Sequence, residues 1–493
     1  NLKKKFYLCR DRYGIKPLYY HITKNKTLIY GSETKSILEY DDYNRLIDKE
    51  ALIEYFTFQN FFTNKTLHKS IKILEPGNYI EINLMSKNFK KKQYWDFDFS
   101  NSEVIKDERE YSEELDRIFC KAVKRHLISD VSVGSYLSGG MDSGSITAIT
   151  SKHFEQLNKI LKTFTVGFDL TSASGLERNF DERAKAEFMS YKFKTEHYEM
   201  VLKSGDMERC MEEFTYHIEE PRVGQSYPNY YAAKLASKFV KVVLSGSGGD
   251  ELFAGYPWRY YKVKSVKNFN DYIDKYYKYW QRLISNKELI KMFSPISNDF
   301  KNVWTRDIFK NVFKNLSEAK TSEEYINQSL YFEAKTFLHG LLIVEDKLSM
   351  AHSLETRVPF LDNELVDFAQ KIPIKFKLNN VNKLAKINEN EIKKSKITTD
   401  GKIILRKSMI KNIPKDIYSA VKQGFSSPDQ SWFKGESINF VKEKLLSRDA
   451  LIYDYMDKKT VKKLINQHLN GKINRRLLIW SLLNFETWLK IYG

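Results

Sequence analysis

Between residues 130 and 245, short apolar runs alternate with stretches of helical hydrophobic spacing. Apolar runs bounded by turn residues are typical of buried strands, whereas apolar positions three or four apart are typical of helices. The predicted strands are 131–137, 161–168, 196–201 and 241–244, and the predicted helices are 182–191, 206–218 and 227–239. The alternation predicts an α/β fold with a parallel sheet, whose ligands bind beyond the carboxyl ends of the strands.

The pattern differs on either side of this region. Residues 1–95 alternate short apolar runs with turns, which predicts an α+β domain rich in antiparallel pairing. Residues 96–110 are polar without a sustained period and are predicted to be a linker. Ser112 is the predicted N-cap of a following helix, and from Val263 onward the pattern is helical. We therefore expect a first domain at 1–95 and a second at 111–493.

A glycine-rich turn follows the first strand of the predicted sheet. The segment Ser138–Ser143 (SGGMDS) lies between that strand and a helix that starts with Ile146. Glycines let the backbone approach a ligand, and the amide groups of a helix N-terminus attract phosphate. Ser138 and Ser143 add hydroxyl donors, and Asp142 could hold the metal of a polyphosphate. The turn lacks the lysine of a P-loop, and the alternative is an ordinary Gly-Ser turn.

A second glycine-rich turn, Ser245–Glu251 (SGSGGDE), follows the strand at 241–244. Both turns leave carboxyl ends of one predicted sheet, and both carry an aspartate. Asp142 and Asp250 could therefore share a Mg²⁺ ion on a nucleoside triphosphate. The alternative is a loop whose acidic residues only cap a helix.

Two further charged segments lie downstream. Glu345–Asp362 (EDKLSMAHSLETRVPFLD) concentrates charge in an apolar stretch, including Asp346, Glu355 and Arg357. Buried charges of this kind are usually paired, so a structural ion pair is at least as good an explanation as substrate contact. Lys422 lies in the segment VKQGFS, where a lysine alone carries little information in so basic a chain.

The chain of 493 residues carries a formal charge of +18. Its lysines are spread along the sequence without a nucleic-acid-binding module, which favours a generally basic surface over nucleic-acid binding. The three cysteines are far apart and form no zinc or disulfide pattern, as expected for a cytoplasmic protein. The longest apolar runs are too short for a membrane helix, and no leader sequence is visible.

The motifs together resemble those of the glutamine-hydrolysing asparagine synthetases. SGGMDS resembles the pyrophosphate-binding loop of ATP-pyrophosphatases, and the segments at 245–256, 345–362 and 421–426 follow in the family's order. Residues 10–20 (RDRYGIKPLYY) and 30–35 (YGSETK) resemble the last third of the family's glutaminase domain. The family's nucleophile, an N-terminal cysteine, has no counterpart here, so we expect no glutamine hydrolysis from this chain alone.

The resemblance implies a sheet of the ATP-pyrophosphatase type and a set of site residues. ATP and pyrophosphate would contact Leu137, Ser138, Gly139, Gly140, Asp142, Ser143, Val166, Ser245 and Gly246. Lys422 would neutralise the leaving pyrophosphate, Asp142 and Asp250 would bind Mg²⁺, and Asp250 and Glu251 are candidate catalytic groups. Asp346, Glu355 and Arg357 are weaker candidates for substrate binding.

One position departs from the family. The residue after Ser-Gly in the second loop is commonly acidic and takes a proton from the incoming amine, but here it is Ser247. A serine hydroxyl is no general base near neutral pH without a partner, so Asp250, Glu251 or a nearby group would have to act.

The predicted function is an ATP-dependent ligase that adenylates a carboxylate, aspartate by default, and transfers ammonia to it. The partners would be that acid and ammonia, supplied by glutamine in the full-length family, with a homodimer possible and neither nucleic acid nor membrane involved. There are three alternatives: another amidotransferase that acts on a sugar acid or a peptide, a tRNA-modifying ATP-pyrophosphatase, and a non-catalytic relative.

Overall fold

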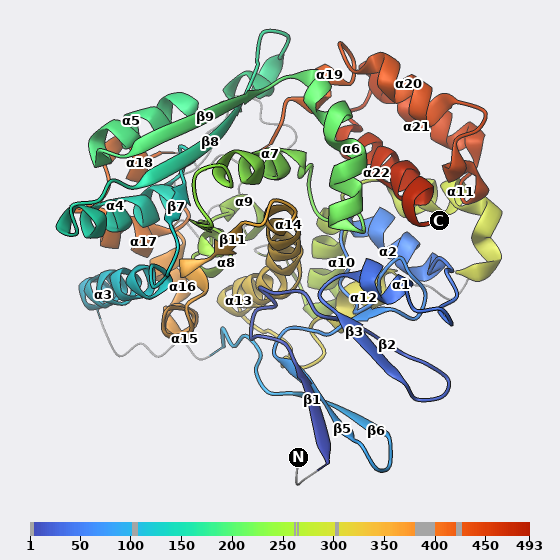
Figure 1. The fold of residues 1–493 in the computed structure, drawn as a ribbon, viewed down its shortest axis with the longest axis horizontal. Helices are drawn as coiled ribbons and strands as arrows, with labels where there is room; N and C mark the ends of the chain where they lie inside the picture. Colours follow the sequence, from blue (N-terminus) through green and yellow to red (C-terminus); the bar gives the residue numbers. More distant parts are fainter. Residues whose placement is uncertain are drawn as a thin grey trace.

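The largest sheet of the molecule has five parallel strands and lies in the upper left part of Figure 1. In this computed structural model, which describes residues 4–100, 107–260, 263, 266–300, 305–379, 400–420 and 426–493, every strand pair of this sheet is parallel. The strand order is β11-β10-β7-β8-β9. The strands are β7 (Val133–Tyr136), β8 (Lys162–Phe168), β9 (Glu196–Leu202), β10 (Val242–Leu244) and β11 (Glu355–Arg357). The predicted α/β class and the parallel sheet are confirmed.

The order of the strands creates a switch point beside β7. From β7 the chain moves outward through α4 (Met141–Gln156), β8, α5 (Arg183–Phe193) and β9 on one side. It then returns through α6 (Ser204–Ile218) and α7 (Tyr227–Ala236) to β10 on the other side of β7. The loops after β7 and β10 therefore diverge from neighbouring strands, which opens a crevice at their carboxyl ends.

Residues 4–95 form two small antiparallel sheets below the five-stranded parallel sheet in Figure 1. One contains β1 (Lys5–Cys9), β5 (Asn78–Asn83) and β6 (Asn88–Gln93), and the other contains β2 (Tyr19–Ile22), β3 (Leu28–Gly31) and β4 (Lys72–Ile73). Two helices accompany them, α1 (Thr34–Leu38) and α2 (Lys49–Phe58). Strand β6 was not predicted, because its sequence NFKKKQ is largely exposed and lacks an apolar face.

The helix after the predicted linker begins earlier than the sequence pattern suggested. Helix α3 (Glu108–His126) is capped by Asp107, whose side chain accepts from the Glu110 amide while Glu110 reaches back to Asp107. This capping box, and not Ser112, fixes the start. Within the same polar stretch, Phe97 and Phe99 are buried in the main hydrophobic cluster, because aromatic side chains spaced two apart can point to one face of an extended chain.

Apart from β11, the described residues from 263 onward form helices and their connections, as predicted. The longer helices are α10 (Phe269–Trp280), α13 (Ser322–Phe332), α14 (His339–Met350), α15 (Asn363–Lys371), α20 (Ile438–Leu446), α21 (Lys458–Leu469) and α22 (Arg476–Tyr492). Tyr55 and Phe56 of α2 share one buried cluster with Trp480 and Trp488 of α22. The core therefore runs without a break from the N-terminal sheets into the C-terminal helices.

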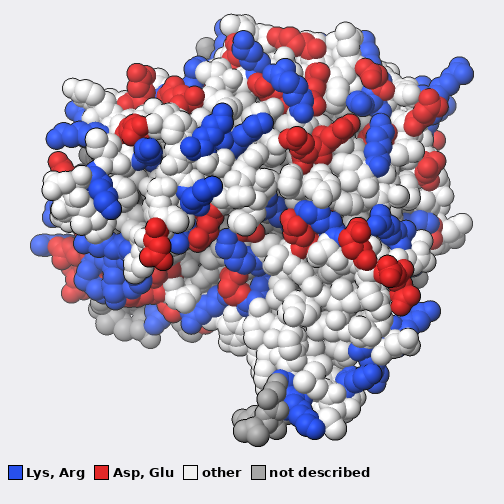
Figure 2. All heavy atoms as spheres, in the orientation of Figure 1, with Lys and Arg blue, Asp and Glu red and all other residues white. Residues whose placement is uncertain are grey.

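Basic and acidic side chains are interspersed over the face shown in Figure 2. No lysine- or arginine-only field covers that face, in keeping with charges spread along the sequence. None of the helices that the structure describes is both long and apolar enough to cross a membrane.

Candidate functional site

A cavity of about 300 Å³ lies at the carboxyl ends of β7, β8 and β10. Its volume is at the lower end of the range for small-molecule sites, which is about 300–1,000 Å³. The two glycine-rich loops line it together with residues of α5, α7, α14 and the segment 401–420. The switch point and both predicted loops therefore coincide in one site.

The first loop is braced by its two serines. The Ser143 hydroxyl lies 3.0 Å from the Ser138 hydroxyl and donates to the Ser138 carbonyl over 3.1 Å. The Gly140 amide donates to the Ser138 hydroxyl over 3.2 Å, and Gly140 is the N-cap of α4. The first amides of a helix have no acceptor within the helix, so this braced loop offers N–H groups to an anion in the cavity.

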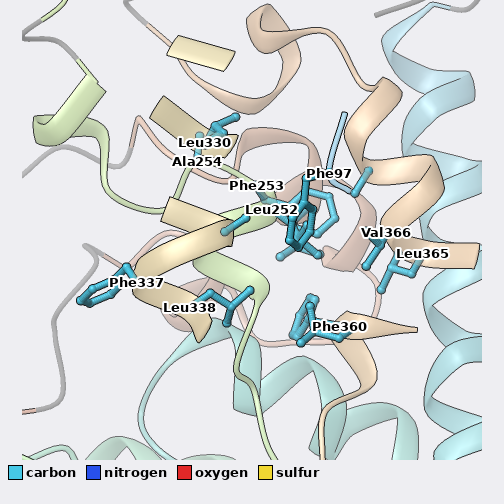
Figure 3. Packing of buried hydrophobic residues seen from close by; sticks show 14 of the residues in the cluster. Phe97, Leu252, Phe253, Ala254, Leu330, Phe337, Leu338, Phe360, Leu365 and Val366 are labelled. Carbon is cyan, nitrogen blue, oxygen red and sulfur yellow. The ribbon is translucent and has the colours of Figure 1, made fainter. Parts of the chain in front are cut away.

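The second loop lies directly against the first. A side chain at Gly249 would place its Cβ 2.8 Å from Cγ of Asp142, a distance that real Cβ atoms do not adopt. Glycine is therefore required here by close approach. The residues that follow anchor the loop, because Leu252, Phe253 and Ala254 point into the hydrophobic cluster seen in Figure 3.

A lysine that the sequence reading did not single out joins the two loops. The Lys402 ammonium lies 2.5 Å from Oδ2 of Asp142 and 2.5 Å from Oδ1 of Asp250. Lys402 is the N-cap of α17 (Ile403–Met409), is 4% exposed, and its amide donates to the Phe253 carbonyl over 3.0 Å. Two carboxylates from separate loops thus share one buried cation.

The two carboxylates also fit a magnesium ion on a polyphosphate. Mg²⁺ is usually held by one or two protein carboxylates together with substrate phosphates and water, rather than by a full protein cage. Among the described residues, no group of three or more histidine, cysteine or acidic side chains is placed to hold a metal. Asp142 and Asp250 therefore supply a partial ligand set that phosphate oxygens would complete.

Two glutamates on the cavity wall have raised pKa values. Burial raises the pKa of Glu251, with nearby Asp250 adding to the effect, and the Tyr256 hydroxyl donates to Glu251 over 3.1 Å. Burial likewise raises the pKa of Glu345 on α14. The Ser247 hydroxyl donates to Oε2 of Glu345 over 2.6 Å. At the position where the family commonly has an acidic residue, this chain therefore has a serine that contacts a carboxylate of α14.

Other predicted residues lie in different places. Leu137 and Val166 line the cavity next to the first loop. Asp346, Glu355 and Arg357 are not among the residues that line it. Asp346 pairs with Lys16 at 2.6 Å, and Glu355 pairs with Arg357 at 2.8 Å. Lys422 lies outside the described residues.

The residues that sequence reasoning missed are Lys185, Lys402, Arg406 and Glu345, all of which line the cavity. Lys402 and Arg406 lie one helical turn apart after Gly401, and this spacing was the available signal. Glu345 is the first residue of the segment 345–362, which resembles a family motif, but the resemblance assigned no function to this residue. Nothing local distinguishes Lys185 from the chain's many surface lysines.

A cavity at the switch point of a parallel sheet, with two glycine-rich loops and a carboxylate pair, is typical of an α/β enzyme that binds a phosphorylated ligand. The sequence matches the asparagine synthase family over residues 114–490 and a glutamine amidotransferase domain over residues 1–95. The chain belongs to the asparagine synthase family, and it is an asparagine synthase-like ligase.

Individual relatives are similar over most of the chain. Asparagine synthetase [glutamine-hydrolyzing] 1 of Bacillus subtilis is 30% identical over 98% of this chain and 74% of its own length. "Putative asparagine synthetase [glutamine-hydrolyzing] 2" of Methanocaldococcus jannaschii is 34% identical over 52% of this chain and 48% of its own length. Amidase chyE of Penicillium rubens is 24% identical over 91% of this chain and 71% of its own length.

Proposed function

We propose that this enzyme adenylates a small carboxylic acid with ATP and then transfers ammonia to the acyl group. A carboxylate oxygen attacks the α-phosphorus, and the bond from that phosphorus to the bridging oxygen of pyrophosphate breaks. Ammonia then attacks the acyl carbon, AMP leaves, and an amide remains. The observation that supports this function best is the meeting of Asp142, Asp250 and Lys402 between two phosphate-binding loops.

Different residues of the chain would bind different parts of the polyphosphate. The braced Ser138–Ser143 loop binds pyrophosphate through its amides and hydroxyls, with Ser245 and Gly246 facing it from the second loop. Lys402 offsets the charge that develops on the leaving group, and we assign the same task to Lys422. Mg²⁺ on Asp142 and Asp250 would supply further charge stabilisation.

The adenosine would lie beside Leu137 and Val166. Leu137 is joined to β8 by its amide, which donates to the Phe164 carbonyl over 2.9 Å. Both residues line the cavity where the first loop leaves the sheet, which supports assigning the Val166 backbone to adenine. This arrangement, with the phosphate loop after β7, supports a sheet of the ATP-pyrophosphatase type.

Aspartate is the proposed acid, and asparagine the product. The names of the Bacillus and Methanocaldococcus relatives support this choice. A sugar acid or a peptide carboxylate is the alternative within the class; a relative of similar coverage, from Penicillium, is named an amidase and not an asparagine synthetase.

The test is acid-dependent exchange of labelled pyrophosphate into Mg-ATP, together with amide formation in the presence of ammonium. L-aspartate and a set of sugar acids and peptides are compared. We expect one acid to support both reactions, and Asp142→Asn to abolish both without unfolding the protein. Absence of exchange with every acid would refute the proposal.

A further inference from the structure

The contact between Ser247 and Glu345 joins a loop to a helix far away in the sequence. The Ser247 hydroxyl donates to Oε2 of Glu345 over 2.6 Å, and both residues line the cavity. Ser247 occupies the position where the resembling family commonly has an acidic residue. We propose that Glu345, acting through the Ser247 hydroxyl, accepts the proton that ammonia loses when it is acylated; this inference rests on the proposed ligase function.

The position of Glu345 is fixed by the residues beside it on α14. Asp346 pairs with Lys16 of the N-terminal part, and Lys347 pairs with buried Glu219. These two ion pairs fix α14 to Lys16 and to Glu219, neither of which lines the cavity, whereas Glu345 does line it. The Ser245 hydroxyl lies 3.3 Å from that of Ser247, so the pair has a second hydroxyl group beside it.

The other acidic groups of the cavity are engaged differently. Asp250 lies against the Lys402 ammonium, where it fits metal and phosphate better than an amine. Glu251 is 2% exposed and accepts the Tyr256 hydroxyl. Glu345 is half-buried and lines the cavity, so a nucleophile beside the second loop can reach the Ser247–Glu345 pair.

The proposed step is balanced in atoms and charge. The nitrogen lone pair of ammonia forms a bond to the acyl carbon of the acyl-adenylate, which leaves a positively charged nitrogen. That nitrogen gives a proton to the Ser247 oxygen while the Ser247 hydroxyl proton passes to the Glu345 carboxylate. The bond from the acyl carbon to the AMP oxygen then breaks, AMP departs as a phosphate, and Glu345 returns its proton to water. No oxidant or reductant is needed.

The test separates the two half-reactions in Glu345→Gln. Pyrophosphate exchange into ATP with L-aspartate, or with whichever acid supports exchange in the wild-type protein, reports adenylation alone. Amide formation with ammonium reports both steps. We expect exchange to stay within a few-fold of wild type, and amide formation to fall by about 100-fold or more, the usual worth of a general base. Hydroxylamine, which is largely uncharged near neutral pH and more nucleophilic, should restore much of the lost rate.

Two further variants guard against a merely structural effect. Ser247→Asp combined with Glu345→Gln returns a carboxylate to the loop and should recover part of the amide-forming rate. Glu54→Gln is a matched control, because Glu54 is a buried glutamate outside the cavity that accepts the Thr63 hydroxyl at the same 2.6 Å. Glu54→Gln should keep the wild-type ratio of amide formation to exchange, even where it lowers stability.

The outcomes distinguish this inference from the function on which it rests. Exchange absent from the wild-type protein with every acid would overturn both. Normal exchange together with undiminished amide formation in Glu345→Gln would overturn only the role of Glu345. An equal loss of both reactions in Glu345→Gln, without recovery by hydroxylamine or by the double variant, would also overturn it, because the residue would then serve adenylation or folding.

Discussion

At the scale of single residues, the cation between the two loops has the largest predicted effect. Lys402→Met removes the ammonium that lies 2.5 Å from both Asp142 and Asp250. Two neighbouring carboxylates then lack that shared charge, and under the proposed function the leaving pyrophosphate would lose a donor. We expect acid-dependent pyrophosphate exchange to fall by about 100- to 1,000-fold, as for the loss of one preorganised charge-stabilising group.

The control for this variant lies in the same helix. Lys407→Met removes a lysine that pairs with Glu108 on the surface, where an ion pair contributes at most about 1 kcal/mol. Its exchange rate should match the wild-type rate, measured under the same ATP and magnesium concentrations. A Lys402→Met protein as active as Lys407→Met would show that the bridge has no part in catalysis.

The same residues show what a sequence can predict about a site. The loops at Ser138 and Ser245 were predictable because glycines, hydroxyl groups and an aspartate stand side by side in the chain after a strand. Lys402 and Glu345 come from segments far from either loop, and their place depends on how helices α14 and α17 pack. Only the folded chain brings such groups together, so the spacing of Lys402 and Arg406 could mark a helix face but not its place beside the two loops.

At the scale of elements, the strand and helix types were largely predictable, whereas the helix starts, the two-residue strand β4 and the exposed strand β6 were not. Helix α3 is the clearest case, because Ser112 and Asp107 are both suitable cap residues by type. Asp107 caps because it accepts the Glu110 amide over 2.9 Å and Glu110 reciprocates over 3.1 Å. The reciprocal pair satisfies two backbone amides at once. A ranking of residue types at the N-cap considers one residue at a time and so does not include this contribution.

A pair of alanine substitutions tests this helix start. Asp107→Ala removes the acceptor of the Glu110 amide and should lower the free energy of unfolding of this part of the protein by about 1 kcal/mol. Ser112→Ala lies inside the helix and should change it by less than about 0.5 kcal/mol. Hydrogen exchange of the amides at the start of α3 measures both. A larger effect from Ser112→Ala would favour the later start.

At the scale of the whole molecule, the N-terminal sheets and the synthetase part behave as one packed body. Tyr55 of α2 donates to the Ser481 hydroxyl over 2.9 Å, and the Lys35 amide of α1 donates to the Glu219 carboxylate over 2.7 Å. Lys16 pairs with Asp346, the neighbour of Glu345 on α14. A displacement of the N-terminal sheets would therefore reach the helix that carries the proposed proton acceptor.

The buried pair Lys347–Glu219 lies at this junction and predicts a pH-dependent stability. Lys347 is 3% exposed and Glu219 is fully buried, so Lys347→Met leaves a carboxylate without its closest charge partner. Breaking such a pair costs about 3–5 kcal/mol. We expect a lower thermal midpoint by calorimetry at neutral pH, whereas Lys35→Met, which removes a more distant partner at 3.8 Å, should have a smaller effect.

The sign of the pH dependence follows from the pKa of Glu219, which its contacts with Lys347 and Lys35 lower from the ordinary 4.5 despite burial. A lowered folded-state pKa contributes stability that is present above the unfolded value and is lost as pH falls through the folded value. In Lys347→Met the buried carboxyl group can instead take up a proton as pH falls, which relieves its desolvation. The difference in thermal midpoint between wild type and variant should therefore shrink as pH is lowered from 7 through about 4.5. A difference that stays constant over this range would show that Glu219 does not titrate with folding, and that the cost of the variant comes from packing around the lysine stem.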